Sequence, residues 1–158
     1  MNALRALPLV GLAAACHRAV VVGSPTLTSL EGVVTVTGSS FATQFELQHD
    51  NRVTRLLASG ADSAALVRLS GVTVEARGAV SDRGMQVTSF TALNVAGAPV
   101  VDGVVRVDGT AVSLETAKGS VRLGNPPDVL RRMAGARIWV SGPIDTGPNS
   151  YGVIVPAR

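Results

Sequence analysis

Several residue types that build catalytic and metal sites are nearly absent from this chain. It has one cysteine, Cys16, so no internal disulfide can form and packing must stabilise the fold. It has two histidines, His17 and His49, and neither a Gly-x-Ser-x-Gly motif nor a glycine-rich phosphate loop. A zinc site needs three or four Cys, His or carboxylate ligands, and no such cluster is visible. The sequence therefore predicts no enzyme, no metal site and no cofactor.

Aromatic residues and net charge are also low. The five aromatic residues are Phe41, Phe45, Phe90, Trp139 and Tyr151. Proteins that bind single-stranded nucleic acid combine basic charge with several stacking aromatics. The formal net charge is only +3, and Arg5 contributes one of these charges. Nucleic acid is therefore not expected as a partner, and neither is a small-molecule substrate.

The first residues have the three parts of a secretory signal. A short segment with one positive charge, Arg5, precedes an apolar run from Ala6 to Leu12, and three alanines lead to Cys16. An apolar run of about 10 residues is too short to cross a bilayer, which needs about 20. The segment resembles the lipobox of bacterial lipoproteins, although Ala13 stands where leucine is usual.

The resemblance to a lipobox has consequences for location. In bacterial lipoproteins the cysteine after the cleavage site receives diacylglycerol and becomes the mature N-terminus. The resemblance implies that residues 1–15 are a signal peptide, that Cys16 is lipidated, and that residues 16–30 form a tether. The protein would then lie in the bacterial cell envelope, anchored to a membrane by its lipid and facing the periplasm or the cell exterior. Cleavage without lipidation, after an Ala-x-Ala pattern, and an uncleaved leader are the alternatives.

The rest of the chain contains two copies of one pattern. Residues 31–38 (EGVVTVTG) match residues 102–109 (DGVVRVDG), and residues 69–78 match residues 133–142. The offset is 71 residues for the first motif and 64 for the second, so the second copy is shorter by about one loop.

The apolar period within each copy predicts three strands, one helix and two further strands. In the first copy the strands are expected at 33–37, 41–47, 53–57, 72–79 and 85–93, with a helix over 61–69. In the second they are expected near 103–108, 111–117, 120–123, 136–142 and 151–155. Gly71 stands where a left-handed residue should end the first helix, and Asn125 is expected to cap the second.

This order of elements is similar to that of the OB-fold, a five-stranded Greek-key barrel with a helix between its third and fourth strands. The resemblance implies an all-β protein with one short helix per repeat, made of two tandem OB-like barrels over residues 31–98 and 99–158. Each copy has only about 60 residues, so we expect the two to pack on each other to complete their cores.

Strand alternation separates core from surface positions. Val74 and Ile138 are expected as equivalent core residues, while Arg137 and Trp139 point outward. An outward tryptophan either fills the interface between the barrels or lies under the tether, or it contacts a partner. The aspartates Asp102, Asp108 and Asp145 are expected to be solvated carboxylates at strand ends and turns.

The second copy has a small basic excess, with seven basic and five acidic residues against five and six in the first. The candidate partner-binding residues are therefore Trp139, Arg137, Arg131, Arg132 and Arg122.

The sequence predicts a non-enzymatic envelope lipoprotein that acts as a binding or assembly module for another envelope protein. The alternative is an OB-fold protein that binds oligosaccharide or nucleic acid. A groove lined by two or more exposed aromatics would favour the alternative, whereas a flat apolar patch beside unpaired strand edges would favour a protein partner.

Overall fold

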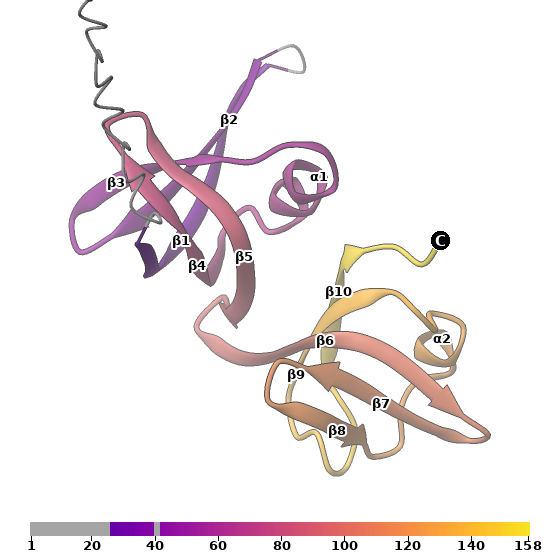
Figure 1. The fold of residues 1–158 in the computed structure, drawn as a ribbon. Coiled ribbons are helices and arrows are strands. Elements are labelled where there is room, and N and C mark those ends of the chain that lie inside the picture. Colours follow the sequence, from indigo (N-terminus) through magenta and orange to yellow (C-terminus); the bar gives the residue numbers. More distant parts are fainter. Residues whose placement is uncertain (1–25, 40–41) are drawn as a thin grey trace, which may run out of the picture.

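The chain folds mostly as antiparallel β-sheet with two short helices (Figure 1). The computed structural model describes residues 26–39 and 42–158. The predicted signal peptide, the lipidation site Cys16, most of the predicted tether and Phe41 lie outside the described residues. In the part of the chain that is described, no helix is both long and apolar enough to cross a membrane.

The elements follow the predicted order twice. The first half consists of β1 (Leu27–Ser39), β2 (Ala42–His49), β3 (Arg52–Leu57), α1 (Gly60–Arg68), β4 (Val72–Ser81) and β5 (Gly84–Val95). The second half consists of β6 (Ala98–Asp108), β7 (Ala111–Thr116), β8 (Gly119–Leu123), α2 (Asp128–Arg131), β9 (Arg137–Ser141) and β10 (Ser150–Val155).

In the first half every strand pairs with two others. β1 pairs with β2 and β4, β2 pairs with β3, and β5 pairs with β3 and β4, so the pairings return to β1. All are antiparallel except β3 with β5, which is parallel and limited to Leu56 opposite Met85 and Leu57 opposite Gln86. Within the described ranges, Arg52 to Thr54 of β3 therefore have a strand neighbour on one side only.

The second half has the linear order β8, β7, β6, β9, β10. Among the described residues no pairing joins β8 to β10, so the ring of pairings seen in the first half is not completed. The loop between β9 and β10 partly covers this opening, because the Gly124 N–H after β8 donates to the Ile144 carbonyl at 2.8 Å.

The two halves are joined by a hairpin instead of a flexible linker. β5 and β6 pair through Asn94 opposite Pro99 and Val95 opposite Ala98. The two turn residues between them, Ala96 and Gly97, have φ values of 50° and 82°. Two positive φ values in succession are typical of a type I′ turn, which closes hairpins tightly.

Matching backbone contacts occur at matching positions of the two sequence motifs. The Gly71 N–H donates to the Val34 carbonyl at 2.8 Å, and the Gly135 N–H donates to the Val105 carbonyl at 2.9 Å. Both glycines have positive φ values, 80° and 84°, a backbone conformation that is unfavourable for residues with a Cβ atom. The left-handed residue predicted after the first helix is thereby confirmed at Gly71.

Strand alternation in the structure confirms the predicted register. Val74 and Ile138 are both 0% exposed, and the residues that follow them, Glu75 and Trp139, are only partly buried. The buried apolar side chains form two clusters, one in each half. A cluster of this kind excludes water from apolar area, the dominant favourable contribution to folding.

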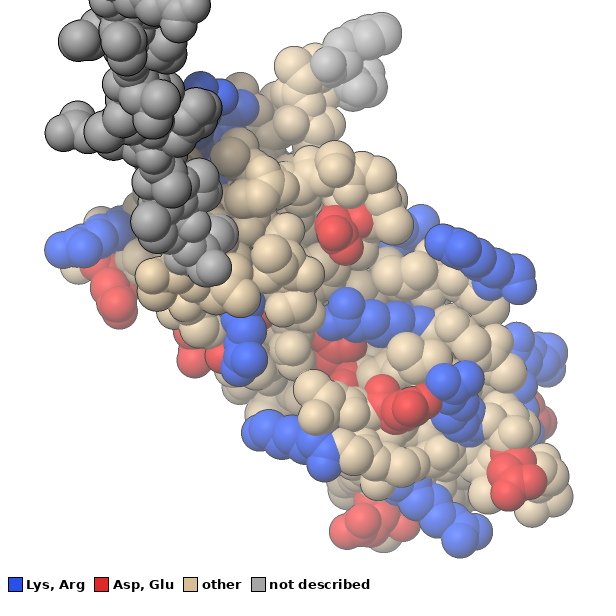
Figure 2. Space-filling model, in the orientation of Figure 1, with Lys and Arg blue, Asp and Glu red and all other residues tan. Residues whose placement is uncertain are grey.

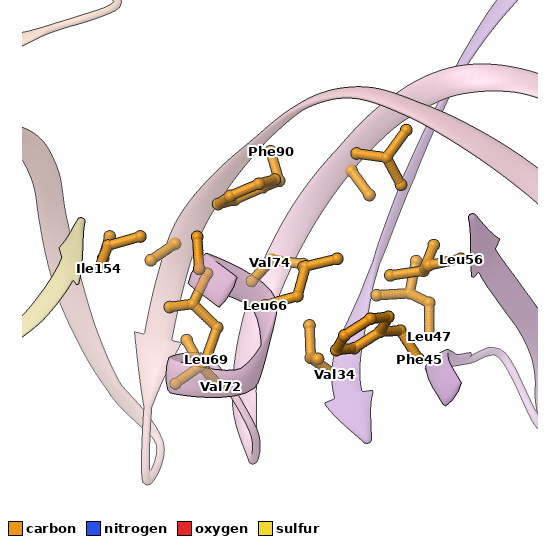
Figure 3. Close-up of a cluster of buried hydrophobic side chains, with 14 of the residues drawn as sticks. Val34, Phe45, Leu47, Leu56, Leu66, Leu69, Val72, Val74, Phe90 and Ile154 are labelled. Carbon is orange, nitrogen blue, oxygen red and sulfur yellow. The ribbon is translucent and has the colours of Figure 1, made fainter. Parts of the chain in front are cut away.

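One residue of the second half belongs to the core of the first. Ile154 on β10 is fully buried and is part of the first cluster, and Figure 3 shows it pointing toward the side chains of that cluster. Its neighbour Val153 packs against the second cluster. Successive side chains of a strand point to opposite faces, so Val153 and Ile154 reach different clusters. The β9–β10 register shifts between Val153 and Val155, and Val155 packs against the first cluster as Ile154 does. The expected packing of the two halves on each other is confirmed.

Two local predictions were wrong. Residues 27–30, assigned to the tether, belong to β1, because Leu27 to Leu30 pair with residues 76–79 of β4. The second helix is only four residues long, its N-cap is Pro127, and no side chain caps it. Asn125 has a φ of 38° and lies before two prolines, so it is too far from the first helical turn to cap it.

Candidate functional site

The most extensively bonded polar site of the described residues lies where the two halves meet. The Asp102 carboxylate on β6 accepts from Arg137 on β9 through Nε at 2.8 Å and Nη2 at 2.7 Å. It also accepts from the Ala92 N–H on β5 at 2.8 Å, and Arg137 Nη2 donates to the Phe90 carbonyl at 2.5 Å. The guanidinium lies 4.8 Å from the centre of the Phe90 ring. We call these four residues the junction.

The junction takes the place of a strand neighbour. The Phe90 carbonyl and the Ala92 N–H are two residues apart, so they point to the same side of β5. Arg137 supplies the donor and Asp102 the acceptor that a paired strand would otherwise provide. Because buried backbone groups without partners are costly, the pair stabilises the edge of β5 where β6 leaves it.

This arrangement corrects the expectation for Asp102. The sequence indicated a solvated carboxylate, but the Asp102 side chain is only 2% exposed and accepts three hydrogen bonds, two from Arg137 and one from Ala92. Arg137, 27% exposed, is its ion-pair partner inside the molecule. The structure therefore places Arg137 between the halves, where its Nε and Nη2 donate to groups of this chain.

Trp139 lies in the same strand as Arg137 and packs against the first cluster. It faces Gly152 on β10 in the strand register. A Cβ at Gly152 would come within 2.5 Å of Trp139 Cε2 and 2.6 Å of Cζ2. The indole thus covers the glycine. Of the three positions that the sequence left open for Trp139, the structure shows the one between the halves.

We expect Gly152→Ala to lower the free energy of unfolding by about 1 to 3 kcal/mol, since overpacking displaces the Trp139 ring. Tryptophan fluorescence reports the same change directly, because Trp139 is the only tryptophan in the chain. Gly97→Ala is the control: its Cβ would meet nothing within 4 Å, although its positive φ adds strain. Equal fluorescence changes in both variants would contradict the contact.

The remaining predicted partner-binding residues are dispersed over the second half. Arg131 donates to the Thr110 carbonyl and lies 3.5 Å from Asp128, while Arg122 and Arg132 form no ion pair with a described residue. Figure 2 shows basic side chains in small groups separated by acidic ones on the face in view. Their role in binding a partner stays a prediction.

A surface that the sequence reasoning missed lies on the first half. Val33, Gln48 and Val53 form one row across β1, β2 and β3. Val33 is 37% and Val53 60% exposed, and together with the turn residues 49–52 the row lines a hollow of about 330 Å³. We call this the hairpin surface. The sequence carried part of the signal, since Val53 and Arg55 are two residues apart in a strand and therefore share a face. Only the pairing of three strands shows that the two valines lie in one row.

A second hollow, of about 300 Å³, lies at the other end of β3. Its polar lining residues are Thr43, Gln44, Arg55, Ser59, Ser63 and Gln86. Gln86 Nε2 donates to the Leu57 carbonyl at 3.2 Å, which fixes one side of the amide. We call this the polar hollow. Its hydroxyl and amide groups can donate and accept hydrogen bonds.

Among the ionisable groups of the described residues, Glu75 has a pKa displaced from its ordinary value. The Ser29 hydroxyl at 2.6 Å and the Arg77 guanidinium at 3.1 Å lower the pKa of Glu75 below its ordinary value of 4.5. The contribution of Glu75 to stability is therefore present above that value and is lost as the pH falls through the lowered pKa.

His49 Nε2 shares a hydrogen bond of 2.8 Å with the Thr54 hydroxyl across the hairpin. Within residues 26–39 and 42–158 no group of three or more His, Cys, Asp or Glu could hold a metal ion.

Comparison of the chain with protein-family models, with curated proteins and with solved structures finds no match.

Proposed function

We propose that the protein is a non-enzymatic lipoprotein of the bacterial cell envelope, anchored through Cys16, that serves as a binding or assembly module for another envelope protein. In this proposal its two halves are OB-like barrels. The ring of pairings in the first half supports a barrel, since every strand has two neighbours. The same order of strands and helix supports a second, more open barrel in the second half.

The observation that carries the binding role is the hairpin surface. Exposed Val33 and Val53 lie in one row beside a section of β3 that has no strand neighbour on its outer side among the described residues. Apolar side chains next to an unpaired strand edge are a common docking site for other proteins. Among the aromatic residues of the described part only Tyr151 is exposed, whereas a platform for stacking bases or sugars uses several aromatics.

We expect Cys16→Ser to prevent acylation and release the protein from membranes, because each buried methylene of a lipid chain contributes about 0.8 kcal/mol to membrane binding. Mass spectrometry of the mature N-terminus and membrane fractionation measure this. Protein isolated from its native membrane with an unmodified Cys16 would refute the anchor.

The partner is sought by placing a photo-reactive amino acid at Val53, with Val67 on α1 as the matched control at 49% exposure. We expect irradiation of intact cells to give a defined cross-linked envelope protein from position 53 and not from position 67. Loss of that product when Val33 is changed to Ser would tie it to the hairpin surface. The same products from both positions would contradict a specific partner.

The polar hollow supports a second candidate function, the binding of an oligosaccharide or a nucleic acid. Three hydroxyl side chains, two amides and Arg55 surround it, and such groups bind polyhydroxyl ligands by multiple hydrogen bonds. Titration with chitin oligosaccharides or a single-stranded oligonucleotide, followed by NMR, tests it. Shift changes centred on Ser63 and Gln86 would support this candidate over the first.

A further inference from the structure

We propose that the outer edge of β3 accepts an extended, acidic segment of the partner as an added strand. This inference rests on the proposed function, because it specifies how a protein would bind at the hairpin surface. Strand addition uses backbone hydrogen bonds for affinity and alternate side chains for specificity.

The edge is available because β3 is paired unequally on its two sides. It pairs with β2 from Arg52 to Leu56, but with β5 only at Leu56 and Leu57. The outer side of Arg52 to Thr54 therefore has no strand neighbour among the described residues. These positions are exposed or partly buried, so the edge is open to solvent.

The turn geometry identifies the groups that face outward. Asp50 and Asn51 have φ values of 44° and 58°, typical of a two-residue type I′ turn. In such a hairpin the residues flanking the turn, His49 and Arg52, form a hydrogen-bonded pair. Bonded and non-bonded pairs alternate in an antiparallel ladder, so Val53 has its N–H and its carbonyl directed away from β2.

The side chains along this edge specify the chemistry of the added strand. Val53 is 60% exposed and offers an apolar contact. Arg52 and Arg55 are exposed, and neither forms an ion pair with another described residue. A strand with carboxylates placed to meet these two guanidinium groups would gain charge-assisted hydrogen bonds.

Charge also disfavours two other occupants. A second copy of β3 would place its own Arg52 and Arg55 beside this pair, and like charges across neighbouring strands are destabilising. Residues 17–25 of the same chain include Arg18 and no acidic residue. The edge thus favours an acidic segment of a different protein.

The test uses the full-length Cys16→Ser chain, NMR, and two short synthetic peptides. In one, two glutamates three residues apart are separated by two valines, because Arg52 and Arg55 are three residues apart and lie on opposite faces of β3. The other peptide has lysine in place of both glutamates. We expect the glutamate peptide to shift the amide signals of Arg52 to Arg55 and to slow hydrogen exchange at Val53. The lysine peptide should bind at least about tenfold more weakly.

Two variants separate the backbone from the side chain. Val53→Pro removes the outward N–H, a change that edge strands tolerate, and should weaken binding of the glutamate peptide by about tenfold or more. Val53→Ser keeps that N–H and should weaken binding by only about threefold. If the proline variant does not fold, exchange protection of the Val53 amide in the parent chain decides the matter.

The inference is overturned if the glutamate peptide leaves Arg52 to Arg55 unchanged, if the lysine peptide binds equally well, or if Val53→Pro binds like the parent. Failure of the proposed function would look different. In that case peptide addition at β3 would persist while position 53 gave no cross-linked envelope protein in cells.

Discussion

Arg137→Met is expected to lower the free energy of unfolding by about 3 to 5 kcal/mol. The substitution leaves the Asp102 carboxylate, 2% exposed, without its counter-ion, and it leaves the Phe90 carbonyl without its donor. A buried charge without a partner is strongly destabilising even where the intact pair adds little net stability. Denaturant unfolding followed by circular dichroism measures the change.

The matched control is Arg106→Met. Arg106 also forms an ion pair with a carboxylate, Glu115, but the two side chains are 62% and 56% exposed. Removal of an exposed pair should cost less than about 1 kcal/mol. The double variant Asp102→Asn with Arg137→Met should recover part of the loss, since the asparagine would carry no charge while its side-chain oxygen could still accept from the Ala92 N–H. Equal losses of unfolding free energy from Arg137→Met and Arg106→Met would contradict this prediction, because they would mean that the Asp102 charge does not need Arg137 more than an exposed carboxylate needs its partner.

Much of the fold was predictable because its signals are local. The alternation that places Val74 and Ile138 in the core has a period of two residues and can be read within one strand. The turn at Asp50 and Asn51 and the left-handed Gly71 depend on residues adjacent in sequence. Extension of β1 back to Leu27 was missed because it depends on pairing with β4, about 50 residues further along the chain.

The sites were less predictable because they combine distant residues. Asp102 and Arg137 are 35 residues apart, and Phe90 is 47 residues from Arg137. Nothing near Asp102 in the sequence distinguishes it from Asp108, which is exposed at the end of the same strand. The difference arises because the hairpin at Ala96 and Gly97 turns β6 back along β5, which brings only the earlier aspartate to the Ala92 N–H.

The dependence of each half on the other leads to a second large effect, at Ile154. Ile154→Ala is expected to lower the free energy of unfolding by about 2 to 5 kcal/mol, because it opens a cavity in a core that tolerates little loss of volume. The side chain is fully buried, and it belongs to the cluster of the first half although its strand belongs to the second. Figure 3 shows it at the margin of that cluster, on the same side as Leu69.

The location of the destabilisation distinguishes a shared core from two independent ones. If β10 completes the first core, Ile154→Ala should speed hydrogen exchange at the buried residues Leu66 and Val74, which are more than 75 residues away in sequence. Tyr151→Ala is the control on the same strand, since Tyr151 is 36% exposed and belongs to neither cluster. Faster exchange confined to β9 and β10 would mean that the halves fold separately. Faster exchange in both halves would mean that β10, although it belongs to the second half, is part of the core on which the first half depends.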